Sequence, residues 1–166
     1  MKIRLEQQNI GAAIMQIAEH TNFTAINRLK VGGEIINNGF LINGDIAVLC
    51  KYASEPNGSD EYLFNFNSDH LDNIAKIQKG KHRLYFVLIC VEEGEICCLT
   101  EEEFDTLIVN RKKSAKVDED QYQILVTAKK NASLRAYVNA AGKKGKIAGK
   151  MLTVARNSFP QALFEK

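Results

Sequence analysis

The sequence predicts a domain of the α/β or α+β class, in which helices pack on one mixed central sheet. Three patterns support this prediction: apolar residues at helical spacing near the N-terminus, a strand-like alternation at 62–67, and a continuous apolar run from Leu84 to Val91. Helix-like and strand-like segments follow one another through the first 110 residues, as expected when helices cover a sheet.

The first predicted element is a helix over residues 5–20, where apolar side chains recur along one face. Two Asn-Gly pairs follow, at Asn38-Gly39 and Asn43-Gly44. Such pairs favour tight turns because both residues tolerate positive φ. They therefore delimit two adjacent strands, at 39–43 and 45–53.

The next predicted elements are a strand at 62–67 and a helix that begins at Ser68. A serine at this position can accept a hydrogen bond from a free amide of the first turn, and Gly80 ends the helical pattern. The run from Leu84 to Val91 has no polar face, so we expect it in the middle of the sheet, covered on both sides.

A strand at 96–99 leads into a third helix. Thr100 and Glu103 have the spacing of a capping box, which predicts a helix over 101–109. The rest of the chain is rich in Lys and Gly and predicts three short strands, at 121–128, 134–139 and 151–155.

Length and composition favour a single domain over residues 1–166, with an α/β core at 1–110 and a basic, β-rich subregion at 111–166. The 166 residues contain only two prolines and no flexible linker. Charges near Met1 argue against a secretory signal, and no apolar run approaches the ~20 residues of a membrane span. We expect a cytoplasmic protein with no membrane partner.

All four cysteines lie in apolar runs, which favours buried, reduced thiols over a disulfide or zinc site. Cys97 and Cys98 point to opposite faces if they lie in a strand. The three histidines have no nucleophile partner at a motif spacing, so we expect surface or capping roles for them, including His70 in the first turn of a helix.

The charge of the chain is strongly asymmetric. Residues 1–110 contain nine basic and sixteen acidic residues, whereas residues 111–166 contain thirteen and four. This split suggests that the C-terminal third binds nucleic acid or another acidic partner without catalysis. The candidate contacts are Lys129, Lys130, Arg135, Lys143, Lys144, Lys146, Lys150 and Arg156.

The stretch from Gly142 to Lys150 is the densest part of this set. It does not match a phosphate-binding loop, because Gly149-Lys150 is followed by Met151 rather than Ser or Thr. A flexible basic hairpin can instead place lysines along a phosphate backbone and displace counterions. The alternative is a solvated, lysine-rich turn with no partner.

The order helix, three strands, helix, strand, with Gly44-Asp45 opening the second strand, resembles the core of the PD-(D/E)XK nuclease superfamily. The resemblance implies a restriction-endonuclease-like core with Mg²⁺ held by Asp45 and a second carboxylate. The next strand has Asn65-Phe66-Asn67 in place of the acid-x-Lys pattern. The resemblance therefore implies one of two alternatives. The protein is either a degenerate relative that binds nucleic acid without cutting it, or a nuclease whose site is rebuilt from Glu61, Lys51 and Glu34, with Asp45 and Glu61 as metal ligands.

Two further alternatives remain open. Asp45 fits equally well as the end of an Asn-Gly-Asp turn. The acidic residues of 92–103 form either a solvated surface or a patch that meets the basic region of a second copy, which would make the protein a homo-oligomer, an interaction protein or a small-ligand binder.

Overall fold

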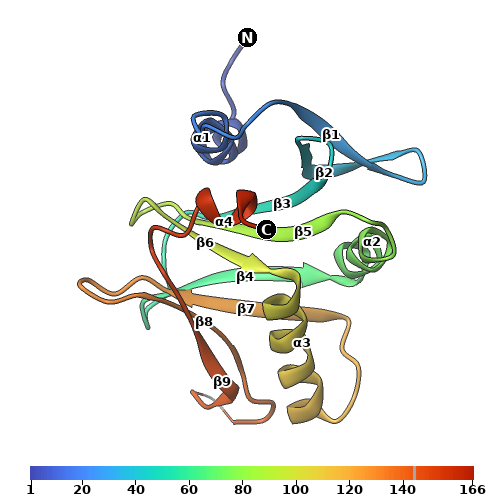
Figure 1. Ribbon diagram of the computed structural model, residues 1–166. Coiled ribbons are helices and arrows are strands. Elements are labelled where there is room, and N and C mark those ends of the chain that lie inside the picture. The colour runs from blue at the N-terminus through green and yellow to red at the C-terminus, as the bar shows by residue number, and fades with distance from the viewer. Residues whose placement is uncertain (144) are drawn as a thin grey trace.

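A computed structural model describes residues 1–143 and 145–166 as a mixed α+β fold with two sheets, one of them mixed, and four helices. Figure 1 shows the layers, with α1 on one side of the larger sheet and the smaller sheet on the other. The elements are α1 (Leu5–Ala18), β1 (Ile26–Val31), β2 (Glu34–Ile42), β3 (Ile46–Ala53), β4 (Glu61–Asn67), α2 (Ser68–Gln78), β5 (Arg83–Cys90), β6 (Glu95–Thr100), α3 (Glu101–Ala115), β7 (Gln121–Thr127), β8 (Leu134–Asn139), β9 (Ile147–Val154) and α4 (Gln161–Phe164).

The predicted class is confirmed, with a mixed sheet and helices packed on it, but the strands divide between two sheets instead of the expected one. The five-stranded sheet has the order β1-β2-β3-β5-β6 and the four-stranded sheet the order β4-β7-β8-β9. β3 and β5 are parallel, whereas every other pair of neighbours is antiparallel. The loop after β3 carries the chain to the other layer, where β4 pairs with β7.

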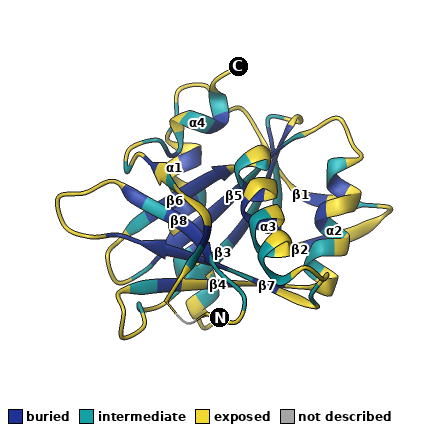
Figure 2. Cartoon of the chain, turned by 90° about the horizontal axis from the view of Figure 1, so that it is seen from below, coloured by how far each residue is buried: buried dark blue, intermediate teal, exposed yellow. Residues whose placement is uncertain are grey.

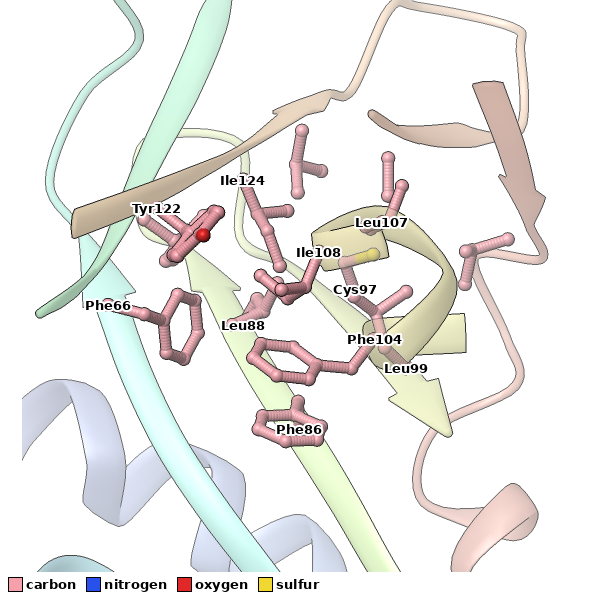
Figure 3. Close-up of a cluster of buried hydrophobic side chains, with 14 of the residues drawn as sticks. Phe66, Phe86, Leu88, Cys97, Leu99, Phe104, Leu107, Ile108, Tyr122 and Ile124 are labelled. Atoms are coloured by element: carbon pink, nitrogen blue, oxygen red, sulfur yellow. The ribbon is translucent and has the colours of Figure 1, made fainter. Parts of the chain in front are cut away.

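The larger core lies between the two sheets and is built around aromatic side chains. Phe86 of β5 and Phe104 of α3 stack with their ring centroids 3.9 Å apart, and Phe66 of β4 meets Phe104 edge-on at 5.0 Å. Figure 3 shows these rings beside Tyr122 of β7. Such aromatic pairs stabilise a core beyond the area that they bury.

A second core covers the opposite face of the five-stranded sheet. Ile10, Ala13 and Ile17 of α1 pack there, together with Phe159 and Leu163 near the C-terminus. In Figure 2 the buried segments follow the strands, while exposed residues lie at turns and on outer helix faces. The five-stranded sheet is therefore a middle layer with apolar material on both sides.

The apolar run at 84–91 forms an interior strand, as its lack of a polar face predicts. β5 pairs with β3 on one side and with β6 on the other, and Val87 and Leu88 are both 0% exposed. The predicted hairpin across Asn43-Gly44 is also confirmed, because β2 pairs antiparallel with β3.

The cysteine prediction agrees with the structure. Adjacent Cys97 and Cys98 of β6 enter different cores, Cys97 between the sheets and Cys98 beneath α1. All four thiols are free and buried. Burial raises the pKa of Cys50, Cys90 and Cys98 to about 12.

Several boundaries differ from the sequence prediction. β1 was not predicted because Leu29 is its only buried residue, so it lacks an apolar pattern. α3 continues to Ala115 instead of 109, since its last turns carry Arg and Lys rather than an apolar stripe. β9 begins at Ile147 rather than 151. None of the helices within 1–143 and 145–166 has the length and apolar character needed to cross a bilayer.

Candidate nucleic-acid interface and the surroundings of Lys51

The predicted basic contacts do not form one patch among the described residues, because β8 separates them. Lys129 and Lys130 lie in the turn before β8, and Lys143 and Lys146 lie in the turn after it. β8 has six residues, so at ~3.3 Å per residue the two turns are ~20 Å apart. Lys144 falls outside the described residues.

Arg156 is held inside the fold and is not a free contact. Its guanidinium pairs with Glu95 at 2.9 Å and also donates to the backbone carbonyls of Ala132 and Lys129. These bonds join the segment after β9 to β6 and to the turn before β8. Arg135 is half-buried and donates to the carbonyl of Leu134 at 3.4 Å.

The turn after β8 is fastened to the C-terminal end of α3. Arg111 Nη1 donates to the carbonyl of Asn139 at 2.9 Å, and the amide of Ala141 donates to Ser114 Oγ at 2.8 Å. The turn itself closes with a bond of 2.7 Å from the amide of Ala140 to the carbonyl of Lys146. Figure 1 shows the end of α3 and this turn at the same end of the molecule.

These bonds bring together lysines from two segments that are distant in sequence. We call this group the lysine pole; its described members are all exposed. They are Lys113, Lys116, Lys143, Lys146 and Lys150. Sequence analysis missed Lys113 and Lys116 because it ended the helix at 109; the Arg-Lys-Lys run after Asn110 was the available signal.

Two acidic residues between α3 and β7 pair with basic side chains of α3. Glu119 accepts two hydrogen bonds from Arg111, at 2.7 and 2.9 Å, and these bonds hold the pKa of its carboxyl below the usual range. Asp118 lies 3.7 Å from Lys112. The pole lysines themselves have no carboxylate within 4.0 Å in the described chain.

Some of the acidic residues of 92–103 form bonds within the chain. Glu95 pairs with Arg156, and Glu103 forms the predicted capping box with Thr100 at the start of α3. Assembly through an acidic patch stays a prediction.

The residues of the nuclease resemblance do not share a site. Asp45 pairs with Arg83, the first residue of β5, at 3.6 Å. Glu61 precedes Tyr62, whose hydroxyl accepts a bond from Glu93 in the turn after β5. β5 has eight residues, so the two carboxylates lie at opposite ends of a strand of ~25 Å. They do not fit a common Mg²⁺ ion, and no three His, Cys, Asp or Glu side chains in the described residues gather as metal ligands.

The asparagines that replace the acid-x-Lys pattern have structural partners. Asn65 accepts hydrogen bonds from Gln121 and Gln123, both at 3.0 Å, on the outer face of the smaller sheet. Asn67 is the N-cap of α2 and accepts from the amide of His70 at 2.9 Å. Glu61 receives hydrogen bonds from Asn57 and from the hydroxyl of Tyr137. The nuclease-like core stays a prediction.

Lys51 lies in a pocket that sequence analysis did not predict. Its ammonium is 3.5 Å from His70 Nδ1 and 4.9 Å from the centroid of the Phe66 ring. Burial lowers the pKa of Lys51, and burial followed by the positive charge of Lys51 lowers that of His70. His70 Nδ1 accepts from the amide of Asn67 at 3.1 Å. The expected capping role of His70 is confirmed, but its side chain also lines this pocket.

Comparison of the chain with models of protein families, with curated proteins and with solved structures gave no match.

Proposed function

We propose that this protein binds nucleic acid without catalytic turnover, and that the lysine pole is its contact surface. The observation that supports the proposal is the pair of hydrogen bonds from Arg111 and Ser114 to the segment after β8. They hold the end of α3, with Lys113 and Lys116, beside the turn between β8 and β9, with Lys143 and Lys146. The strong positive charge of residues 111–166 supports the same proposal.

Electrostatics explains why such a surface favours a polyanion. Each lysine that neutralises a phosphate releases a condensed counterion, so affinity falls as salt rises, with a slope of about 0.9 per contact on duplex DNA. Exposed lysines without carboxylate partners keep this charge available. Contacts of this type position the protein on the backbone and read no base sequence.

The test compares two triple variants that remove the same charge. Lys113, Lys143 and Lys146 are changed to Gln in the pole, and Lys76, Lys79 and Lys81, exposed in and after α2, are changed to Gln as the control. Binding of a labelled duplex and of a single strand is followed by fluorescence anisotropy between low and moderate salt.

We expect the pole variant to bind both probes at least ten-fold more weakly at low salt, and its salt slope on the duplex to fall by about 3. The control should retain most of the wild-type affinity. Equal losses in the two variants would assign binding to overall charge, and wild-type affinity in the pole variant would refute the proposal. A third variant, Lys129→Gln with Lys130→Gln, measures how much the turn before β8 contributes to nucleic-acid affinity.

A further inference from the structure

A polar pocket opens where α2 lies beside β2, β3 and β4. Its volume is about 150 Å³, and its apolar wall is formed by Ile36, Leu49, Phe66 and Ile74. For scale, an engineered apolar cavity of this volume accommodates one benzene molecule. A shallower hollow with Lys51 and His70 in its lining adjoins it. The pocket therefore has room for a small, partly apolar molecule.

Lys51 is the one lysine or arginine among the described lining residues. No carboxylate lies within 4.0 Å of it in the described parts of the chain. Two acidic side chains lie close to the lining: Glu6 accepts a hydrogen bond from the side-chain amide of Asn38 at 3.3 Å, and the charge of Asp69 acts on His70 in the direction that raises its pKa. A half-buried charge normally finds a partner, because burial without one is costly.

The remaining polar groups of the pocket are neutral. His70 Nδ1 accepts a backbone hydrogen bond, so the ring is neutral with its proton on Nε2. Asn37 and Asn73 are among the lining residues, and their side chains make no hydrogen bond with the described residues. One cation with two free amides balances the single charge of a carboxylate, whereas it would leave one charge of a phosphate dianion unbalanced.

We propose that this pocket binds a small organic carboxylate, with its carboxylate on Lys51 and the amides of Asn37 and Asn73, and with its apolar body against Phe66 and Ile74. The proposal is independent of nucleic-acid binding, because no residue of the lysine pole lines the pocket.

Benzoate is the probe and benzamide its neutral counterpart of the same shape. Titration is followed by two-dimensional amide NMR of the full chain. We expect benzoate to bind with about millimolar affinity, as befits so few heavy atoms. The largest shifts should appear at Asn37, Lys51 and Asn73, and benzamide should bind at least five-fold more weakly.

Two variants test the assigned groups. Lys51→Met keeps the aliphatic stem and removes the charge, so it should weaken benzoate binding at least ten-fold and leave benzamide unchanged. Asn73→Ala should weaken benzoate binding by a smaller factor. Lys76→Met, at an exposed position of α2, should leave the affinities for benzoate and for benzamide unchanged.

Three results would overturn the proposal. They are the absence of benzoate shifts at Lys51 and Asn73, equal affinity for benzoate and benzamide, and wild-type benzoate affinity in Lys51→Met. If Lys51→Met does not fold, Asn73→Ala decides: unchanged benzoate affinity in that variant refutes the assigned site.

Discussion

The two sheets bury their strands in different ways. β3 and β5 of the five-stranded sheet are covered on both faces, by the core between the sheets and by the core beneath α1. The four-stranded sheet has one apolar face, whereas its other face carries Asn65, Gln121 and Gln123 in a hydrogen-bonded group. The candidate nucleic-acid contacts belong to the second sheet and its turns, to the segment after β9 and to the C-terminal end of α3. The strands at the centre of the five-stranded sheet are therefore buried on both faces, whereas the four-stranded sheet keeps a polar group on its outer face.

The largest expected effect comes from a charge placed inside the middle layer. Val87 is 0% exposed, so Val87→Asp buries an unpaired carboxylate and should destabilise the protein by about 3–5 kcal/mol. Asn65→Asp places the same group on the outer face of the other sheet, where Gln121 and Gln123 donate to it, and should be nearly neutral. Urea unfolding compares the two. Similar losses would contradict the contrast between the sheets.

High pH should weaken the five-stranded sheet in particular, because all four cysteines lie in it. The folded-state pKa of Cys50 is raised from 9.0 to about 12 by burial. The contribution of such a thiol to the free energy of unfolding is fully present below pH 9 and is lost as pH rises toward 12. The reason is that only the thiol of the unfolded chain ionises between these two pH values. Each such thiol changes the free energy of unfolding by up to about 1.4 kcal/mol per pH unit.

Cys50→Ala tests this pH dependence. Its loss of stability between pH 8 and pH 11, measured by urea unfolding, should be smaller than that of the wild type. Equal slopes would show that Cys50 does not contribute. Lys130→Ala, at an exposed position in the other sheet's turn, serves as the control.

Arg156 connects the two layers, and its loss should have an intermediate effect. Arg156→Met leaves Glu95 and two backbone carbonyls without their donor, so we expect a loss of about 1–3 kcal/mol. Lys130→Met, in the same turn, should stay within about 0.5 kcal/mol of the wild type. If Arg156→Met proves as stable as the wild type and binds nucleic acid more weakly, Arg156 is a contact after all.

The smallest expected effect is on nucleic-acid cleavage. Because Asp45 and Glu61 lie at opposite ends of β5, we expect no Mg²⁺- or Mn²⁺-dependent cutting of plasmid, oligonucleotide or branched DNA. Gel assays with the purified protein measure this cleavage. Cutting that Asp45→Ala abolishes would restore the nuclease hypothesis.

Local signals in the sequence predicted local structure well. The unbroken apolar run placed β5 inside a sheet, and the Thr100 and Glu103 pattern placed the start of α3. The division into two sheets was not predictable in this way, because β4 pairs with β7 across the intervening α2, β5, β6 and α3. Alternation shows that a strand has one buried face and does not identify its partner.

The candidate sites show the same difference between local sequence patterns, which are predictable, and tertiary contacts, which are not. Charge counting found the basic third of the chain, but only the tertiary hydrogen bonds separate free lysines from the paired Arg156. The Lys51 pocket gathers residues from β2, β3, β4 and α2 that share no motif spacing. Its formation depends on how the layers stack.

The adjacent thiols of β6 offer a consequence for folding dynamics. Cys97 and Cys98 are neighbours in the chain but are sealed in separate compartments. A small alkylating reagent reaches each thiol only when its own compartment opens. Pulsed labelling with mass spectrometry therefore distinguishes a chain that loosens beneath α1, where Cys98 reacts first, from one whose sheets part, where Cys97 reacts first.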